Sequence, residues 1–573
     1  MQKAEGRRQK ALARRFCILP SAFCILLAAC TPPIAPKPAP LIAPAPPPQL
    51  TTNGVARKVI LASFDGLGAD EVLRFSAPSF QSMPVHATRV IPVEPSATSS
   101  THAAILTGET PQKTGIVANT YHAPGTARDI VTKALESDIA VETIVDVARR
   151  AGKRVGSIAF PFYEWGSPRH TTDFGIGWSL ALTKPRLIKL THADFHSEWL
   201  PPAWGSPAPR HASFSPVMRA RIAWSAPKIA SQDVDVVAYD STNDNVANYD
   251  TLFVEYGGGE TTLDAKHWFA ISEQTPDGRY GSWSKVLRFD PALASMTIYW
   301  GAVSHTRGEA GFVREIDERF GFWPGSADDV SVRDKSIDPE TFAEQNERLS
   351  NFLTQTTHYA MTTRDFDLLL TYQPTVDMAE HQFFDAAGEP IRRAAFAAFD
   401  RSVATLRSDT AAIGGAILIT GDHGLAAVDT EVRMGRILAD WNEPQWTAIA
   451  NGNIAQFYRF GGDDDTDALV NKLTTFRSPD GALIFERVEK KSTSMHANAG
   501  DIVAFSAPRF ALSSVINGEA FVKPLYTGQH GGLTTHPEFH TTLGAEGPGL
   551  QPQTIGAMPQ TGIAPLVKRL LGL

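Results

Sequence analysis

The sequence predicts an α/β fold in which a mostly parallel central sheet carries helices on both faces. Short apolar runs typical of buried strands alternate along the chain with segments of helical periodicity. One of these runs, at 57–64, ends directly at an aspartate, and another, at 416–420, is followed by Gly-Asp, at the position where open α/β sheets place their ligands. With 573 residues, 43% of them hydrophobic and 20% charged, the chain has an ordinary globular composition and is long enough for one decorated domain or two.

The first half of the chain's body shows this alternation most clearly. The run RKVILASF at 57–64 has the length and composition of a buried strand, and it ends at Asp65. The elements that we expect after it are a helix at 69–75, a strand at 87–93, a helix at 141–150 and a strand at 154–160.

Between about residues 179 and 338 the composition changes. Prolines and tryptophans become more frequent, and strand-like runs separated by hairpin-like gaps appear at 234–239, 251–255 and 296–300. We interpret this segment as a β-rich insertion that interrupts the α/β domain and lies over the functional site. The run DSTND at 240–244 resembles the start of a calcium loop but lacks the bidentate glutamate, so a turn is the better interpretation.

Beyond the insertion the alternation of helices and strands resumes. Asp338-Pro339 combines a cap residue with a first-turn proline, which predicts a helix start, and the helix is expected to run to about residue 361. The further elements expected are a strand at 366–372, a helix at 391–406, a strand at 416–420, a helix near 466–476 and a closing helix at 563–571.

The N-terminal segment has the pattern of a secretory signal. Six basic residues among the first 15 precede an apolar run at 16–29 that is too short for a comfortable membrane span. The run ends in LAAC at 27–30, which resembles a bacterial lipobox and predicts residues 1–29 as a lipoprotein signal peptide and Cys30 as the lipid anchor. An ordinary cleaved signal peptide and an uncleaved anchor are the alternatives. The other cysteines, Cys17 and Cys24, also lie in this segment, so the body has no cysteine for a disulfide or a metal site.

Residues 30–55 are expected to form a linker between the lipidated cysteine and the body at 56–573. Proline and alanine dominate it, which favours an extended, semi-rigid spacer. The expected location is therefore extracytoplasmic, on a bacterial membrane and facing the periplasm or the cell exterior. Residues 1–29 hold six Lys/Arg and one Glu, so their removal takes the formal charge from −8 to −13 and argues against a surface for nucleic acid.

A hydroxyl-rich segment at 95–119 is the most informative stretch for chemistry. Its run of serines and threonines leads into a helix-like segment at 101–106, and a helix start is a natural seat for a phosphate oxygen. A hydroxyl group at that position can attack phosphorus only if a base or a metal removes its proton. The alternative is a Ser/Thr-rich loop that caps a core helix.

Carboxylates and imidazoles with the character of metal ligands recur after strands and in glycine-flanked turns. Asp377 and His381 lie four residues apart, so a helix would project both from one face. Asp422-His423 follows the strand at 416–420 and is flanked by glycines, and His530 lies in the run GQHGG. These ligand types suit divalent metal ions.

These motifs, in this order, resemble the alkaline phosphatase superfamily, and specifically its nucleotide pyrophosphatase/phosphodiesterase (type I phosphodiesterase) branch. The nucleophile region matches without a gap at Thr98, His102, Thr107-Gly108 and GIVAN at 115–119. Of the metal motifs, Asp65 precedes this region, and Asp-x-x-x-His, Asp-His-Gly and Gly-x-His-Gly follow it. The resemblance covers about 57–169 and 365–550 and leaves the insertion unmatched.

The resemblance implies an alkaline-phosphatase-like three-layer α/β/α sandwich and a metal-dependent phosphoric ester hydrolase with two zinc ions per chain. It implies that Thr98 is the nucleophile, forming a phospho-threonine, and that Asn119 donates a hydrogen bond to a non-bridging phosphate oxygen. The implied ligands of one zinc are Asp377, His381 and His530, and those of the other are Asp65, Asp422, His423 and the Thr98 oxygen. We interpret His102 as structural and His536 and His540 as surface or supporting residues.

The expected substrate is a small-molecule phosphate ester, either a nucleotide or another diester. The monoesterase relatives carry a Lys-x-Arg pair after the strand equivalent to 154–160, and the corresponding run FPFYEWGS at 160–167 has none. Its aromatic residues suit stacking on a base, and Glu164 would repel a dianion, although Arg169 lies close in sequence. The alternatives are a phosphomonoesterase or phosphonate hydrolase of the same superfamily and, more remotely, an inactive ligand-binding lipoprotein.

Overall fold

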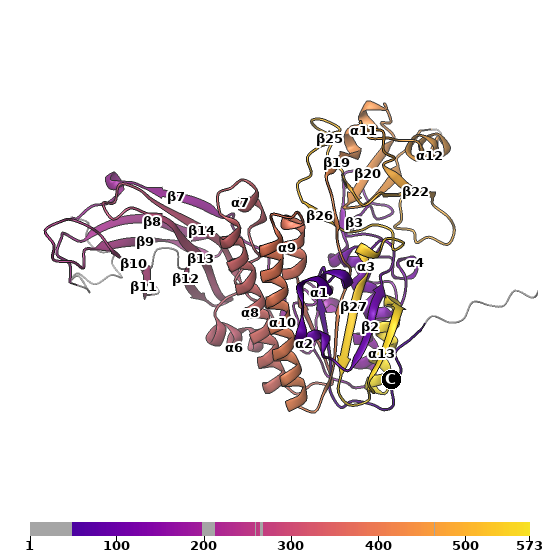
Figure 1. The fold of residues 1–573 in the computed structure, drawn as a ribbon, viewed down its shortest axis with the longest axis horizontal. Coiled ribbons are helices and arrows are strands. Elements are labelled where there is room, and N and C mark those ends of the chain that lie inside the picture. The colour runs from indigo at the N-terminus through magenta and orange to yellow at the C-terminus, as the bar shows by residue number, and fades with distance from the viewer. Residues whose placement is uncertain (1–47, 198–211, 258, 264–267, 463) are drawn as a thin grey trace, which may run out of the picture. The chain divides into compact units, whose positions relative to one another are not determined.

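A computed structural model describes residues 48–573 except for 198–211, 258, 264–267 and 463 (Figure 1). The predicted signal peptide at 1–29, Cys30 and the linker up to residue 47 lie outside the described residues. Among the helices that the structure describes, none is both long enough and apolar enough to cross a membrane.

A nine-stranded sheet forms the centre of the α/β domain, in the order β15-β6-β5-β16-β1-β17-β27-β2-β28. Five neighbouring pairs are parallel and three are antiparallel, which confirms a mostly parallel sheet. The strands are β15 (Arg307–Gly308), β6 (Phe174–Gly177), β5 (Val155–Ile158), β16 (Leu368–Gln373), β1 (Val59–Phe64), β17 (Ala416–Gly421), β27 (Thr541–Glu546), β2 (Val85–Ile91) and β28 (Gln553–Pro559).

Side chains of the central strands alternate between two separate apolar cores, one on each face of the sheet. On β1, Val59 and Leu61 enter one core, whereas Ile60 and Ala62 enter the other. The helices of the first core are α3 (Thr98–Thr107), α5 (Ile144–Arg150) and α13 (Ile563–Leu571). Those of the second are α1 (Ala69–Phe75), α2 (Pro78–Gln81), α6 (Ala310–Phe320), α8 (Pro339–Thr363), α9 (Thr375–Phe383) and α10 (Glu389–Ala412). This arrangement confirms the three-layer α/β/α sandwich.

Local signals place several helix starts correctly. Asp338 caps α8 by accepting a hydrogen bond from the Thr341 N–H at 2.7 Å, and Pro339 occupies the first turn as predicted. The helices α1 and α13 begin and end at the predicted residues. Helix α3 starts at Thr98, three residues before the predicted start at Thr101.

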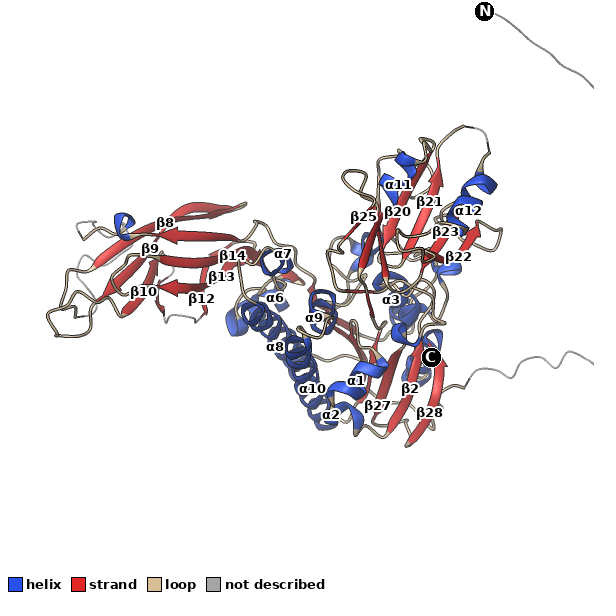
Figure 2. Ribbon diagram, turned by 45° about the horizontal axis from the view of Figure 1, so that its top comes forward, coloured by secondary structure: helices blue, strands red, loops and turns tan. Residues whose placement is uncertain are grey.

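The insertion contains two four-stranded antiparallel sheets that share one apolar core around Trp224, Phe269 and Trp300 (Figure 2). The first sheet consists of β8 (Met218–Ala226), β9 (Ile229–Tyr239), β10 (Thr251–Tyr256) and β11 (Gly259–Leu263). The second consists of β7 (Arg186–Leu190), β12 (Trp268–Thr275), β13 (Gly278–Phe289) and β14 (Met296–His305). The predicted β-rich character is confirmed, and the helices α6 and α7 (Asp329–Arg333) complete the segment.

A further β-rich unit lies between β17 and β27, where the sequence predicted only a mixed stretch with one helix. Its main sheet consists of β20 (Trp446–Asn451), β21 (Ile454–Arg459), β23 (Ile502–Ser506) and β22 (Phe485–Lys490). The strands β19 (Thr430–Arg433), β24 (Phe510–Ser513) and β25 (Phe521–Val522) and the helices α11 (Met434–Asp440) and α12 (Thr466–Thr474) complete it. A hairpin signal was present, because Asn451 ends β20 and Gly452, with a φ of +67°, begins the turn to β21.

Candidate metal centre

The predicted site residues converge at the carboxyl ends of the central parallel strands. Asp65 follows β1, helix α9 with Asp377 and His381 follows β16, and Asp422 follows β17 directly. Because β16, β1 and β17 are parallel neighbours, their carboxyl ends meet at one edge of the sheet. The hydrogen bond from the Asp377 N–H to the Asp65 carbonyl, at 3.1 Å, fixes α9 against this edge.

Asp377, His381 and His530 form a first group of possible metal ligands, with ligand atoms within 4.8 Å of one another. His381 Nδ1 lies 2.8 Å from the Gly528 carbonyl oxygen. Since a carbonyl only accepts, Nδ1 carries the proton and Nε2 is left as the ligand atom, 3.4 Å from Asp377 Oδ1. Among the described residues, the buried atoms Asp377 Oδ1 and His530 Nδ1 have no hydrogen-bond partner.

A second group consists of Asp65, Asp377 and His423, again with ligand atoms within 4.8 Å of one another. Asp65 Oδ2 accepts a hydrogen bond from the Tyr372 hydroxyl, and its Oδ1 lies 3.4 Å from His423 Nε2. Within the described part of the chain, Asp65 Oδ1 and His423 Nδ1 are buried without a hydrogen-bond partner. Asp377 belongs to both groups, so the two candidate metal positions are adjacent.

Asp422 lies at the same site with one carboxylate oxygen already in use. Its Oδ1 accepts hydrogen bonds from the backbone N–H groups of Gly66 at 3.1 Å and His423 at 2.8 Å. Its Oδ2 lies 3.2 Å from His423 Nε2 and accepts a hydrogen bond from the Thr101 hydroxyl at 3.3 Å. The structure therefore places Asp422 next to the second group, with its Oδ2 near His423. Its role as a metal ligand stays a prediction.

The electrostatics of the site favour the binding of divalent metal ions. Burial raises the pKa values of Asp65, Asp377 and Asp422 well above the usual range, and the neighbouring carboxylates raise them further. Burial also lowers the pKa of His381 to about 4 and those of His423 and His530 well below the usual value, so the imidazoles are neutral. Neutral imidazole nitrogens and carboxylate oxygens are the ligand atoms that zinc and similar divalent ions prefer.

Thr98 is the first residue of α3 and is partly exposed, whereas residues 99–107 of the same helix are buried. Its hydroxyl oxygen lies 3.1 Å from His423 Nε2. The hydroxyl of Thr101, where the sequence predicted the helix start, donates instead to the backbone carbonyl of Ala97 at 3.0 Å and approaches Asp422. Thr98 is therefore the residue of α3 whose hydroxyl faces both the ligand groups and solvent.

Asn119 lines the cavity beside the first ligand group. Its Oδ1 accepts a hydrogen bond from the Ser99 N–H at 2.8 Å. A backbone N–H can only donate, so the side-chain amide is oriented with Nδ2 available as a donor. The cavity has a volume of about 340 Å³, and its walls include Asn451, Tyr526 and, from the C-terminal end of the insertion, Asp329.

The remaining histidines lie outside both ligand groups. His102 is fully buried and hydrogen-bonded at both ring nitrogens, to the Ser63 hydroxyl at 2.9 Å and the Thr98 carbonyl at 2.8 Å, and burial lowers its pKa to about 4. His536 contacts Glu486 at 2.6 Å, and His540 Nε2 contacts the Thr534 carbonyl at 2.7 Å. These contacts agree with the structural or surface roles expected from the sequence.

The expectation that the aromatic residues of 160–167 would contact a substrate at the metal centre is wrong. The side chains of Phe160, Phe162 and Tyr163 are buried in the apolar core on one face of the sheet. Glu164 accepts a hydrogen bond from the Trp178 N–H at 3.0 Å, and burial raises its pKa to about 8. No residue of this run lines the cavity at the ligand groups, among the residues that the structure describes.

Three residues of the site were not identified from the sequence: Tyr372, Tyr526 and Asp329. Tyr372 is the penultimate residue of β16 and donates its hydroxyl to Asp65. Tyr526 packs its ring against that of His381, with 5.1 Å between ring centroids, and donates its hydroxyl to Asp329 at 2.9 Å. These contacts join segments far apart in sequence, so no local pattern announces them.

Comparisons with known proteins agree with this geometry. The family model described as type I phosphodiesterase / nucleotide pyrophosphatase matches residues 59–225 and 262–533, continuing into the predicted insertion and leaving out 226–261. A protein of Schizosaccharomyces pombe, "Uncharacterized pyrophosphatase/phosphodiesterase C725.05c", is 36% identical over 88 residues, which is 15% of this chain and 18% of that relative. The aligned part thus spans less than a fifth of the relative's length.

The fold is also similar to solved structures. Murine ectonucleotide pyrophosphatase/phosphodiesterase 5 matches with a TM-score of 0.50 and 14% identity, over 90% of this chain and 95% of that chain. Its inactive form in complex with AMP matches with a TM-score of 0.51 over the same shares. These similarities concern the fold, and the family follows from the model that matches most of the chain. The chain belongs to the type I phosphodiesterase/nucleotide pyrophosphatase family, in the alkaline phosphatase superfamily.

Proposed function

We propose that this protein is a two-zinc phosphodiesterase of the nucleotide pyrophosphatase type that uses Thr98 as its nucleophile. The observation that carries the proposal is the pair of ligand groups that share Asp377, together with the Thr98 hydroxyl 3.1 Å from His423 Nε2. Adjacent divalent ions can hold the attacking and leaving oxygens of an in-line displacement at phosphorus. Hydrolysis of a phosphodiester or a pyrophosphate, which the family's name describes, is a displacement of this kind. The AMP bound by a relative of the same fold is consistent with a nucleotide substrate.

The roles of the chain's own residues follow from their positions. Two zinc ions would be held by Asp377, His381 and His530 and by Asp65, Asp422 and His423, and they would supply the positive charge that lowers the pKa of the Thr98 hydroxyl and stabilises the leaving oxygen. Thr98 Oγ1 attacks phosphorus, forming a phospho-threonine as the bond to the leaving alcohol breaks. Asn119 Nδ2 donates to a non-bridging oxygen, and water then hydrolyses the phospho-threonine and restores the hydroxyl.

A preference for diesters is expected from the walls of the cavity. Among the described residues that line it there is no lysine or arginine, so the charge of a monoester dianion would have to be balanced by the metal ions. We expect kcat/KM for bis-p-nitrophenyl phosphate to exceed that for p-nitrophenyl phosphate at least about tenfold, which corresponds to about 1.4 kcal/mol. A third substrate, a nucleotide p-nitrophenyl ester, tests the nucleotide assignment in the same assay.

The same assay, run with metal analysis, tests the proposed function as a whole. Two zinc ions per chain with turnover of either diester support it. Turnover confined to p-nitrophenyl phosphate supports the phosphomonoesterase alternative instead. Turnover of none of the three substrates by protein that contains its metals contradicts the proposal.

We also propose that the protein is anchored through a lipid at Cys30 on the extracytoplasmic face of a bacterial membrane. The support comes from LAAC at 27–30 and from the proline-rich segment after it. Cys30→Ala is expected to move the protein from the membrane fraction to the soluble fraction in cell fractionation, because the acyl chains would be lost. Cys24→Ala is the control, and an unchanged membrane fraction for Cys30→Ala would count against lipidation.

A further inference from the structure

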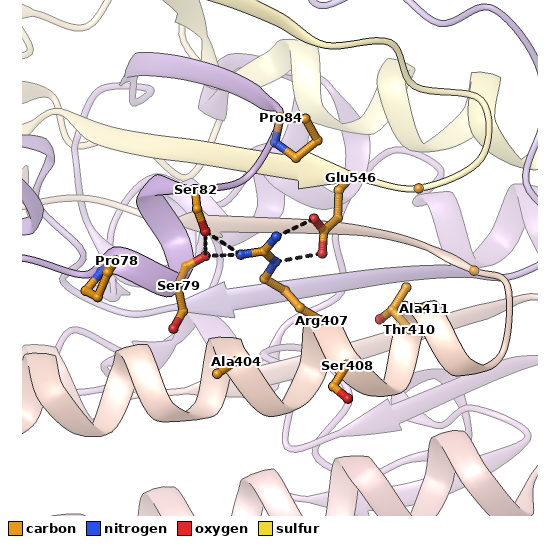
Figure 3. Close-up of a pocket in the computed structure, with 12 residues that line it drawn as sticks. Pro78, Ser79, Ser82, Pro84, Ala404, Arg407, Ser408, Thr410, Ala411 and Glu546 are labelled. Carbon is orange, nitrogen blue, oxygen red and sulfur yellow. Dashed lines mark hydrogen bonds and ion pairs between the residues drawn. The ribbon is translucent and has the colours of Figure 1, made fainter.

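Several cavities away from the metal centre contain arginine residues, and two of these cavities differ clearly in how their arginines are paired. The first, of about 960 Å³, lies between α2, α10 and β27 and contains Arg407 (Figure 3). The guanidinium of Arg407 donates two hydrogen bonds of 2.7 Å to Glu546, and it also donates to the Ser82 hydroxyl and the Ser79 carbonyl. Its charge and donors are already satisfied within the protein, so this cavity offers nothing to a charged ligand.

The second cavity, of about 610 Å³, lies between strands β12 to β15 of the insertion, its helix α6 and the segment that follows β5. Its walls include Trp165, Lys228, His305, Arg307 and Arg314. Lys228 is paired with Asp277 at 2.9 Å. The side chains of Arg307 and Arg314 have neither an ion pair nor a hydrogen bond to any residue that the structure describes.

Arg307 is the informative member of this pair, because its side chain is partly buried. A charge withdrawn from water needs a counter-charge or hydrogen-bond acceptors. Glu164 lies close enough for Arg307 to lower its pKa, yet burial still raises that pKa to about 8, so Glu164 is largely neutral at pH 7. Asp317 also lines the cavity, but its two oxygens accept from the Thr306 hydroxyl and the Arg279 N–H, both at 2.9 Å.

The segment after β5, of which Trp165 lines the cavity, has an uncommon backbone. Ala159, Phe162 and Trp165 have φ values of +54°, +71° and +58°, a region that non-glycine residues rarely adopt and that concentrates at ligand sites. Two rings at this cavity also carry buried nitrogens, Trp165 Nε1 and His305 Nδ1, without a hydrogen-bond partner among the described residues. The unpaired arginines and the unsatisfied ring nitrogens thus lie in the walls of one cavity.

We propose that this cavity is a second ligand site, which binds a dianionic phosphate group, free or as a phosphate monoester, through the guanidinium groups of Arg307 and Arg314. The planar fork of a guanidinium matches the oxygens of a phosphate and forms paired, charge-assisted hydrogen bonds with them. A cavity of this volume admits a small organic phosphate, and the indole of Trp165 provides an apolar wall beside the charged groups. The site is separate from the metal centre, so the inference does not depend on the proposed catalytic function.

Isothermal titration of the zinc-loaded protein with inorganic phosphate, glycerol phosphate and AMP tests the proposal. Wild type is expected to show a class of sites that Arg307→Gln weakens at least about tenfold, through loss of one charge-assisted pair. Arg288→Gln is the matched control, because Arg288 is an exposed arginine of β13 in the same insertion and does not line the cavity. Equal affinity for the three ligands would show that the phosphate group alone is recognised. Tighter binding of AMP would show that the site prefers a monoester whose organic group contacts Trp165.

Identical isotherms for wild type and Arg307→Gln would overturn the inference, as would a single class of sites that disappears in a metal-site variant. A Tm close to that of wild type in the absence of phosphate shows that Arg307→Gln is folded, whether or not the protein turns over a diester. If Arg307→Gln does not fold, Arg314→Gln replaces it, since Arg314 is exposed and its loss leaves no buried gap. Melting curves give a second readout: phosphate should raise the Tm of wild type more than that of either variant.

Discussion

Thr98→Ala is expected to lower the turnover of phosphodiesters by at least about a thousandfold, the scale of loss when a covalent nucleophile is removed. Thr98 is the partly exposed first residue of α3, and its hydroxyl faces His423. The six other predicted ligands stay in place, and in the described part of the chain the one hydrogen-bond contact of this hydroxyl is with His423, not with the helix start. Steady-state kinetics with bis-p-nitrophenyl phosphate, together with the zinc content and the Tm, measures the effect.

Two further variants make the assignment of Thr98 specific. Thr98→Ser keeps an oxygen at the same position and should retain measurable turnover. Ser100→Ala is the matched control, because the Ser100 hydroxyl lies two residues on, is buried and has no hydrogen-bond partner among the described residues. Thr101→Ala is a poorer control, since its hydroxyl donates toward Asp422. Full activity in Thr98→Ala would show that another group attacks phosphorus.

The central sheet could be predicted from the sequence because its strands are buried on both faces. In β1, six consecutive residues are buried, so the strand appears as an unbroken apolar run that ends in Asp65. The helices between the strands follow from capping residues such as Asp338 and from apolar spacing. The β-rich unit after β17 was missed because its strands are short and half-polar, with the Asn451-Gly452 turn as their clearest local sign.

At the candidate metal centre, the residues that converge could be predicted because each lies after a strand end, on the helix that follows one, or in a glycine turn. Their exact grouping could not, because it depends on how α9 lies against β1. The structure places Asp377 between the two groups, whereas the sequence analysis assigned it to one ion. The interpretation of the aromatic run after β5 failed because apolar side chains at a strand end can pack in the core as readily as against a ligand. Phe160, for example, is fully buried.

Asp377→Asn is expected to have opposite effects on the metal-loaded and metal-free protein. Asp377 belongs to both ligand groups, so the change should reduce the zinc content below two per chain. Turnover should fall by more than about a hundredfold, the upper end of the loss from removing only an outer partner of a ligand. In metal-free protein, however, burial and the nearby Asp422 raise the pKa of Asp377, so its carboxylate opposes folding at neutral pH.

The neutral asparagine removes that opposition, so the metal-free variant should melt at a higher temperature than metal-free wild type, while added zinc should raise its Tm less. Calorimetry with and without a chelator, at one pH near 7, measures both effects. Asp385→Asn is the matched control, since Asp385 is exposed just beyond α9 and accepts the Gly388 N–H at 2.8 Å, which an asparagine oxygen also accepts. A metal-free Asp377→Asn protein that melts below wild type would show that Asp377 stabilises the fold without metal. An unchanged zinc content in Asp377→Asn would remove Asp377 from the ligands, because both groups of ligand atoms include it.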